Sequence, residues 1–404
     1  MQYIFPYAVP AIPSCASPPP ARLAIRCGSL LDAFATVEDP RRRQGVRFTL
    51  ASILALAVAA ILSNHLSVLA IAEWGSRQHV DLLGALGFQN AVTPHQSTIQ
   101  RLFAKLNPDS LSTALERHFA ASCPAGGERG SQGVAIDGKA QRGRLSFDPD
   151  DGPVHALSAF LHGKGIVLAQ EPIESHGPTE KAEAELTVAP QLIKRIDWRG
   201  RVMTGDALFC QRNLCQQTVD ERGDYLLIVK ENQPTLYADI RLLFDPPIPS
   251  LPLDDRRQAT TVDNGHGRHR DTRRLTASTD LVGYSDWPGL AQVFRFERTW
   301  KERGEARQEI HYGITSLPPS IADAHRLLEL KRGHWEIENR DHYIKDVTLG
   351  EDRSLIHKGN GPSVMAMLRD ASLSLLHNVG CRAIASRLRC HSCRPEEAVM
   401  LLVS

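Results

Sequence analysis

The sequence predicts an α/β protein in which an all-α N-terminal domain precedes a mixed domain that carries a β-rich insertion. Closely spaced apolar positions with a helical period run from Leu30 to about Phe119. After them the pattern changes to three strands, a helix, a strand, a helix and a strand. A third block, at about 245–316, contains four strand segments in two hairpins. A chain of 404 residues is long enough for several such units.

The same changes of pattern divide the chain into four parts. Residues 1–28 are rich in proline and have no sustained period, so we expect a loose arm. Residues 29–125 form the helical domain, and the glycine-rich stretch from Pro124 to Gly133 is the linker that follows it. The mixed domain is expected over 126–380, and 381–404 remain as a C-terminal tail.

Charge and hydropathy restrict the class of protein. The formal net charge is only +1, so a nucleic-acid partner must be bound by local basic patches. The longest apolar run, Leu50 to Leu62, is shorter than the roughly 20 residues that span a bilayer. No basic segment precedes the apolar N-terminal stretch, so a secretory signal is not expected. We therefore expect a cytoplasmic protein with no membrane partner.

The eight cysteines are scattered through the chain, which is typical of reduced thiols rather than of a disulfide framework. Cys390 and Cys393, with Cys381 nearby, could supply zinc ligands. No second pair follows at the spacing of a zinc finger, so a pair of thiols at a helix end is the favoured interpretation.

A basic segment of the helical domain is suited to a phosphate backbone. It runs from Asp39 to Arg47, and its proline and glycine indicate a loop from which arginines could reach DNA. The alternative is a solvated run of charge. The arginines are Arg41, Arg42, Arg43 and Arg47.

A helix that starts near Pro94, with Thr93 as its N-cap, is a candidate for reading base edges. Its polar face carries Gln96 and Arg101. An ordinary solvated face of an amphipathic helix explains the pattern equally well.

The segment from Gly133 to Arg144 contains the first candidate catalytic acid. The apolar run before Asp137 reads as a buried strand that Gly138 stops, which places Asp137 at the rim. Lys139 and Arg142 follow closely, and carboxylates beside basic residues suit a Mg²⁺–phosphate site. Taken alone, an Asp-Gly pair is more often a simple turn.

A second strand repeats this arrangement, because the run from Arg201 ends in Asp206. The third acid lies on a helix expected from Ser320 to about Lys345. At about 100° per residue, Glu338 shares one face with Trp335, His342 and Lys345. Lys345 could hold the phosphates of the cut strand. Glu336 instead lies between Arg332 and Arg340 at helical spacing, where surface ion pairs are expected.

Two strand-end aspartates and one glutamate on a helix can hold two divalent cations. Such a pair activates a water or a 3′-hydroxyl and stabilises the leaving oxygen during phosphoryl transfer. The sequence therefore predicts a metal site made of Asp137, Asp206 and Glu338.

These motifs resemble the DDE-type transposases of bacterial insertion sequences, in the branch of the H-repeat-associated proteins. The resemblance covers most of the chain after the proline-rich arm. It is carried by Ala135 to Lys139, Thr204 to Gln211, Tyr225 to Pro234, His334 to Asn339 and Gly350 to Ser354.

The resemblance implies a ribonuclease-H-like core with a β-rich insertion before the last acid, and two Mg²⁺ or Mn²⁺ ions on the three acids. Related transposases carry a Tyr and an Arg before the catalytic Glu and a Lys after it. Lys345 meets the last spacing, whereas Lys331 and His334 stand where the Tyr and the Arg would be. Arg332 is out of register for the DNA contact that the Arg makes.

The resemblance also implies the partners: terminal inverted repeats and target DNA, bound by a homodimer, with the protein on the bacterial nucleoid when bound. The expected activity is cutting at the repeats and transfer of 3′-hydroxyl ends. Two alternatives remain open, which are a metal-dependent nuclease of the same fold and an inactive DNA-binding remnant.

Overall fold

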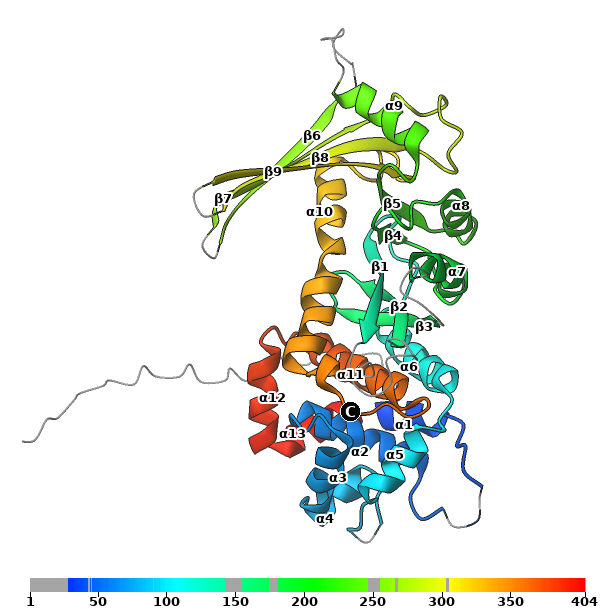
Figure 1. Ribbon diagram of the computed structural model, residues 1–404, viewed down its shortest axis with the longest axis vertical. Helices are drawn as coiled ribbons and strands as arrows, with labels where there is room; N and C mark the ends of the chain where they lie inside the picture. The colour runs from blue at the N-terminus through cyan, green and yellow to red at the C-terminus, as the bar shows by residue number, and fades with distance from the viewer. Residues whose placement is uncertain are drawn as a thin grey trace, which may run out of the picture.

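The computed structural model describes residues 28–403, apart from 43, 45, 90, 142–153, 174–180, 246–254, 266–267 and 303–304. Its centre is one nine-stranded sheet with the strand order β3-β2-β1-β4-β5-β9-β8-β7-β6. Helices from both ends of the chain gather at one end of this sheet, and four long strands project at the other (Figure 1).

The first five strands form the inner part of the sheet. β1 pairs antiparallel with β2 and parallel with β4, and β4 pairs parallel with β5. Every residue of β4 and β5 is buried, as expected for parallel strands covered on both faces. The bounds are β1 (Gln132–Gln141), β2 (Val154–Leu161), β3 (Ile166–Ile173), β4 (Arg201–Gly205) and β5 (Asp224–Val229).

Helices cover both faces of this inner sheet (Figure 1). Met203 of β4 joins the apolar cluster of α7 (Lys181–Lys194) and α8 (Arg212–Asp220). Its neighbour Val202 joins a separate cluster with α10 (Ala324–His334). Successive residues of a strand point to opposite faces, so α10 lies on the face opposite α7 and α8.

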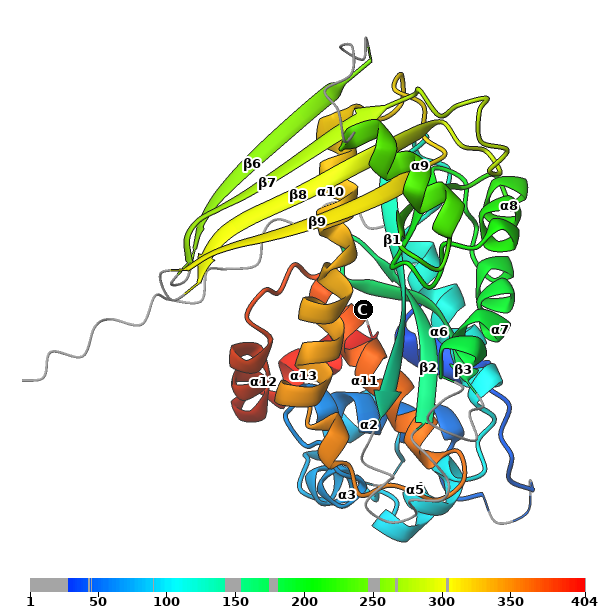
Figure 2. The same cartoon turned by 45° about the horizontal axis from the view of Figure 1, so that its top comes forward.

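The expected β-rich insertion forms an extension of the same sheet. Its two hairpins are β6 (Arg257–Gly265) with β7 (Arg268–Ser278), and β8 (Gln292–Glu302) with β9 (Glu305–Thr315). β9 pairs antiparallel with β5, so the ladder continues without a break. Figure 2 shows these strands as an arm that projects beyond α10. The short helix α9 (Pro234–Phe244) precedes the arm and packs on β8 and β9.

The helical part is built around α2 (Leu50–Leu62), in which every residue except Ala51 is buried. The other N-terminal helices are α1 (Leu30–Ala35), α3 (Val68–Ser76), α4 (Val80–Ala85), α5 (Gln96–Phe103) and α6 (Pro108–Ser122). α5 starts two residues later than expected, because the Nδ1 of His95, not Thr93, accepts the N-cap hydrogen bond from the Ser97 N–H.

The C-terminal segment differs from the expected tail. It forms α12 (Ile384–Cys393) and α13 (Pro395–Val403), and both pack on α2, as does α11 (Gly361–Asn378). The N-terminal and C-terminal helices therefore share one apolar core. Within the part of the chain that the structure describes, no helix combines the length and the apolar character needed to cross a bilayer.

Candidate active site

Asp137 lies on β1 where β1 and β4 separate. Their parallel pairing ends at Ala135 and Thr204, whereas β1 continues beside β2 to Gln141. The prediction that Gly138 stops the strand is therefore wrong. Gly138 stays in the ladder opposite Leu157, and a Cβ at this position would overlap the Glu185 carboxylate. A larger residue at this position would require the Glu185 side chain to move, so the glycine provides space rather than a turn.

Asp206 follows β4 at the same edge of the sheet. Asp137 and Asp206 each come two residues after the last β1–β4 pair, Ala135 and Thr204. The Asp206 carboxylate is exposed and accepts a hydrogen bond of 2.9 Å from the Leu208 N–H. The two aspartates predicted from separate strands thus reach one edge of the sheet.

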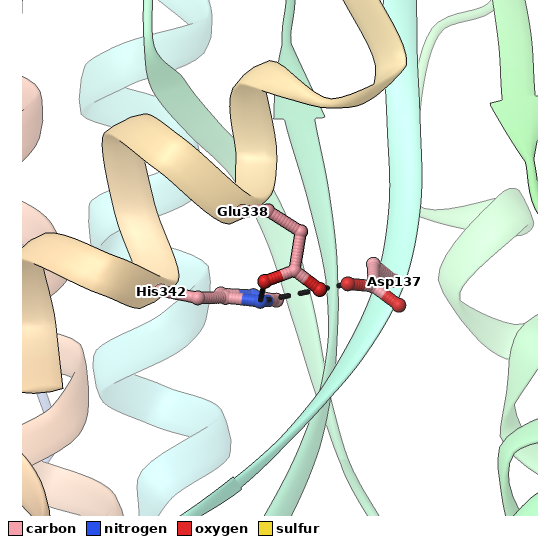
Figure 3. Close-up of side chains that lie close together, drawn as sticks. All are labelled: Asp137, Glu338 and His342. Atoms are coloured by element: carbon pink, nitrogen blue, oxygen red, sulfur yellow. Dashed lines mark ion pairs between the residues drawn. The ribbon is translucent and has the colours of Figure 1, made fainter. Parts of the chain in front are cut away.

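Glu338 and His342 approach Asp137 from the helical segment after α10 (Figure 3). The Nδ1 atom of His342 lies 3.5 Å from Asp137 Oδ2 and 3.6 Å from Glu338 Oε2. One ligand atom from each of the three residues lies within 4.8 Å of the other two. Among the described residues this is the one such group of His, Cys, Asp and Glu, so neither Asp206 nor the cysteines of α12 belong to it.

The segment that carries Glu338 is not a regular α-helix. It consists of two π-helical turns, η3 (Glu338–His342) and η4 (Ile344–Thr348). The Tyr343 N–H donates to the Glu338 carbonyl, five residues back. Because a π turn contains more residues than the 3.6 of an α turn, a residue seven positions later does not return to the same face. π turns occur frequently at functional sites.

Lys345 therefore does not share a face with Glu338. Its ammonium lies 2.8 Å from Asp341 and 2.7 Å from Asp370, and only 3% of the side chain is exposed. Although burial opposes its charge, the two carboxylates raise the pKa of Lys345. The predicted phosphate contact of Lys345 does not fit this placement, since a paired and buried ammonium cannot reach DNA.

Lys139 and Arg332 are also engaged within the protein. The Lys139 ammonium lies 2.6 Å from Asp346, and 9% of the side chain is exposed. The prediction that Lys139 contacts DNA does not fit this placement. Its charge is already paired with Asp346, and a largely covered ammonium needs that partner. Arg332 lies 2.8 Å from Asp263 of β6 and remains 40% exposed. Arg142 lies outside the described residues.

Burial and neighbouring charge perturb both acids of the site. Burial, with the charges of Glu338, Asp206 and Glu185, raises the pKa of Asp137 to about 7. Contact with the His342 imidazole lowers the pKa of Glu338. A cation placed between them would favour the ionised form of Asp137.

The turn between β2 and β3 holds the segment around Glu338. The Gly163 N–H donates to Glu336 at 2.8 Å, and the Gly163 carbonyl accepts from Arg340 at 3.0 Å. Glu336 and Arg340 also form an ion pair of 2.8 Å. These contacts lie two residues before and two residues after Glu338. The expected surface pair of Glu336 with Arg340 is present, and Arg332 pairs elsewhere.

His334 stands where the resembled family has an Arg, but it is half-buried and points toward β4. Its Nδ1 lies 3.3 Å from the Thr204 hydroxyl. Burial lowers the pKa of His334 to about 3, so the ring is neutral. It cannot replace a guanidinium that contacts phosphate.

Lys331 lines a cavity of about 380 Å³ between the arm and α10. Its ammonium lies 5.2 Å from the ring centre of Phe296 and 5.5 Å from that of Trp335. Burial lowers the pKa of Lys331 to about 8. Arg273, Arg298 and Arg332 line the same cavity, but each pairs with Asp263 or Asp271, and Glu309 adds a carboxylate to the lining.

The basic loop of the helical part exposes fewer arginines than predicted. Arg41 is turned inward, with an ion pair of 2.7 Å to Asp39 and a hydrogen bond of 2.9 Å to the Phe48 carbonyl. Arg42 and Arg47 are exposed, and Arg43 lies outside the described residues. On α5, Arg101 is exposed and Gln96 is half-buried.

Sequence reasoning missed His342 as a member of the site. Its signal was the spacing of four residues from Glu338 on one helical segment, which places two potential ligands on the same side. The prediction used that spacing only to choose between Glu336 and Glu338.

Comparison with known proteins identifies two matching family models. The model described as the transposase DDE domain matches residues 131–376, and the model described as DDE_Tnp_1-associated matches residues 31–119.

Two relatives from Escherichia coli match most of the chain. A protein named transposase YncI, from strain O157:H7, is 30% identical over 87% of this chain and 87% of its own. The H repeat-associated transposase YhhI of strain K12 is 25% identical over 86% of this chain and 90% of its own.

One solved structure, of a piggyBac transposase synaptic complex with hairpin DNA, has a TM-score of 0.41 at 12% identity, over 93% of this chain and 79% of that one. This likeness is too distant for a comparison of individual residues.

Proposed function

The chain belongs to the family of transposases with a DDE domain, and we propose that it cuts DNA at the terminal inverted repeats of a bacterial insertion sequence. In this proposal it then transfers the 3′-hydroxyl ends to target DNA. The proposal includes a ribonuclease-H-like core, formed by β1 to β5, and a homodimer on DNA. It also places the bound protein on the bacterial nucleoid in the cytoplasm.

The meeting of Asp137 with Glu338 is the observation that supports this function most directly. The two residues are 201 positions apart, and both face the His342 Nδ1 atom at 3.5–3.6 Å. Asp206 reaches the same edge of the sheet. We propose these three acids as the residues that hold two divalent cations, Mg²⁺ or Mn²⁺, which activate the attacking hydroxyl and stabilise the leaving oxygen.

The residues around the acids have separate tasks in this proposal. The turn between β2 and β3 fixes the Glu338 segment through Glu336 and Arg340. The cavity beside Lys331, where the paired Arg332 remains partly exposed, is the proposed contact for the DNA backbone near the cut. Arg42 and Arg47 contact the backbone of the terminal repeat, and Gln96 and Arg101 read its bases.

A cleavage assay with the full chain tests the proposal. Duplexes that carry the DNA flanking the reading frame are compared with scrambled duplexes, in Mg²⁺ and in Mn²⁺. We expect nicks with 3′-hydroxyl ends at one position, and joining of these ends to a plasmid. Asp206→Asn should stop both reactions and leave binding of the duplex intact.

The two alternatives predict different outcomes of this assay. Specific nicks that never join a plasmid would identify a nuclease. Specific binding without nicks in either metal would identify an inactive remnant. Either result would reject transfer of 3′ ends by this protein.

A further inference from the structure

We infer that His342 is a ligand of a divalent cation, together with Asp137 and Glu338. This inference rests on the proposed metal-dependent function and names a ligand beyond the three acids. It is carried by the spacing of three atoms, by the direction of the imidazole ring and by the carboxylate behind it.

Two of the three spacings match those of ligands around a common ion, and all three ligand atoms lie within 4.8 Å of one another. Two atoms that each lie about 2.1 Å from one cation are between about 3.0 Å and 4.2 Å apart, from adjacent to opposite positions. The Nδ1 atom of His342 lies 3.5 Å from Asp137 Oδ2 and 3.6 Å from Glu338 Oε2, within that interval. Both distances exceed the 2.7–3.2 Å of an N–H···O hydrogen bond. In the metal-free protein these contacts are ion pairs between the imidazole and the two carboxylates, and a bound cation would take the place of the imidazole proton.

The direction of the ring also fits a ligand. Figure 3 shows His342 and Glu338 extending from neighbouring turns of one helical segment toward Asp137 on the strand. The His342 side chain is only 8% exposed, so its orientation is fixed by packing and not by solvent. A neutral imidazole with Nδ1 free is the form that binds metals.

The other ring nitrogen faces a carboxylate. The Nε2 atom of His342 is buried without a hydrogen-bond partner and lies 3.6 Å from Asp341 Oδ2. Histidine ligands commonly donate their second N–H to a carboxylate, which fixes the tautomer and orients the ring. Asp341 is itself held by Lys345 at 2.8 Å. At 3.6 Å the Nε2–Asp341 contact is an ion-pair distance and not a hydrogen bond. In this inference Asp341 becomes the positioning residue when a bound cation draws the ring into place, and Lys345 supports Asp341 from behind the site.

This arrangement explains the use of π-helical turns in the segment. In η3, Glu338 and His342 face the same space, while Asp341 lies beside His342 on the buried side. The rotation that takes Lys345 away from Glu338 places its ammonium against Asp341 and Asp370. One distortion of the helix thus supplies both the ligand and its support.

Mn²⁺ bound to the full-length protein tests the inference without any assay of cleavage. Electron spin echo envelope modulation detects a ¹⁴N nucleus bonded to Mn²⁺. We expect imidazole nitrogen modulation in the wild-type protein and its loss in His342→Gln and His342→Asp. His325→Gln is the matched control, because His325 is an exposed histidine on α10, and it should retain the modulation.

Mn²⁺ titration supplies a second measurement. We expect Asp341→Asn to weaken Mn²⁺ binding about 10- to 100-fold, the usual effect of losing a carboxylate that orients a histidine ligand. His342→Asp should still bind Mn²⁺ through oxygen, which separates the loss of a nitrogen ligand from a failure to fold. Thermal unfolding of each variant checks the fold.

The outcomes distinguish this inference from the proposed function. Mn²⁺ that binds with dependence on Asp137 and Glu338 but shows no nitrogen modulation would overturn the role of His342 and leave the proposed function intact. No Mn²⁺ binding that depends on Asp137 would overturn both.

Discussion

The Nε2 atom of His162 lies 3.0 Å from the hydroxyl of Thr204, which joins the turn after β2 to β4. The His162 ring fills the gap between β1 and α10. Gly133 of β1 and Gly333 of α10 leave room for it, since a Cβ at either position would overlap the Nδ1 atom of the ring. His334 approaches the same hydroxyl from α10. The distance between β1 and α10 is therefore set by the packing of His162 against Gly133 and Gly333. The Glu338 segment follows α10, so its position depends on the same packing.

Gly333→Ala should lower cleavage while DNA binding persists. The added methyl group would displace His162 or α10, and a shift of about 1 Å at the reacting groups costs on the order of 100-fold in rate. The measurement is the single-turnover rate at saturating DNA. Gly84→Ala is the control, because no atom lies within 4 Å of the added Cβ on α4. Equal rates for the two variants would contradict the proposed positioning by His162.

Glu338→Gln should abolish metal-dependent cleavage, because the amide removes the charge that holds the cation while preserving the volume. Glu336→Gln should lose less than tenfold, since the amide oxygen can still accept the Gly163 N–H and only the pair with Arg340 is lost. Cleavage in Mg²⁺, with binding of the same duplex as the control, compares the two. A larger loss for Glu336→Gln would contradict the assignment of Glu338.

Mn²⁺ binding should weaken as the pH falls through about 7. Burial raises the pKa of Asp137 to about 7, so below that pH a proton competes with the metal. Well below pH 7 the affinity should fall by up to tenfold per unit. Titrations between pH 5.5 and 8 measure this slope; a flat profile would contradict the raised pKa of Asp137, and loss of binding in Asp137→Asn tests separately whether Asp137 is a ligand.

The metal-free protein should show the opposite trend in stability. In the folded state Asp137 keeps its proton up to about pH 7, whereas an unfolded Asp releases it near pH 3.9. The contribution of Asp137 to the free energy of unfolding therefore decreases as the pH rises from about 4 to 7. Denaturant unfolding should show that Asp137→Asn removes this part of the pH dependence.

Lys345→Met should destabilise the protein rather than weaken its DNA binding alone. Removing the ammonium leaves Asp341 and Asp370 buried without their partner. Breaking such a buried pair costs about 3–5 kcal/mol. Urea unfolding measures the loss, and Lys358→Met, at an exposed position, is the control. Unchanged stability with weaker DNA binding would restore the role predicted from spacing.

Local patterns predicted the elements well because each depends on neighbouring residues. The hairpins of the arm were readable from alternation and turn residues, and they form β6 to β9. The family and its type of enzyme were likewise predicted from the motifs and are confirmed by the matching models. The strand segments before Asp137 and Asp206 were recognised from their apolar runs, and both residues reach one edge of the sheet.

Features that depend on contacts between residues far apart in the chain could not be predicted from the sequence. Gly138 looked like a stop, but its missing Cβ accommodates Glu185 from another element. The face argument that joined Lys345 to Glu338 assumed an α-helical period, and the π turns changed it. Lys139 looked like a phosphate ligand because its partner, Asp346, is 207 residues away. Burial and pairing of charge arise only in the folded chain.

The shared core of the helical part determines how DNA recognition can be tested. α2 packs on α11, α12 and α13, so removing residues 1–125 would expose the apolar core of the C-terminal helices. We expect that truncated protein to aggregate instead of retaining metal-dependent chemistry. Point variants of exposed residues in the full chain are the appropriate test.

Arg42 and Arg47 are predicted to contact the backbone of DNA, and Arg101 its bases. Arg42 and Arg47 are exposed on the loop before α2, so changing both to Ala should weaken binding to every duplex. Each lost phosphate contact should lower the slope of log affinity against log salt by about 0.9. Arg101→Ala should instead reduce preference for the terminal repeat by about 1–3 kcal/mol, if α5 enters the major groove.

Arg41→Ala separates these effects from damage to the loop. Arg41 holds the loop through Asp39 and the Phe48 carbonyl, so its loss should lower thermal stability with little direct change in the salt slope. Gel shifts of repeat and scrambled duplexes at several salt concentrations measure all the variants. If Arg101→Ala and the double variant lowered affinity for both duplexes equally, α5 would act as a backbone contact, and sequence reading would have to lie elsewhere in the chain.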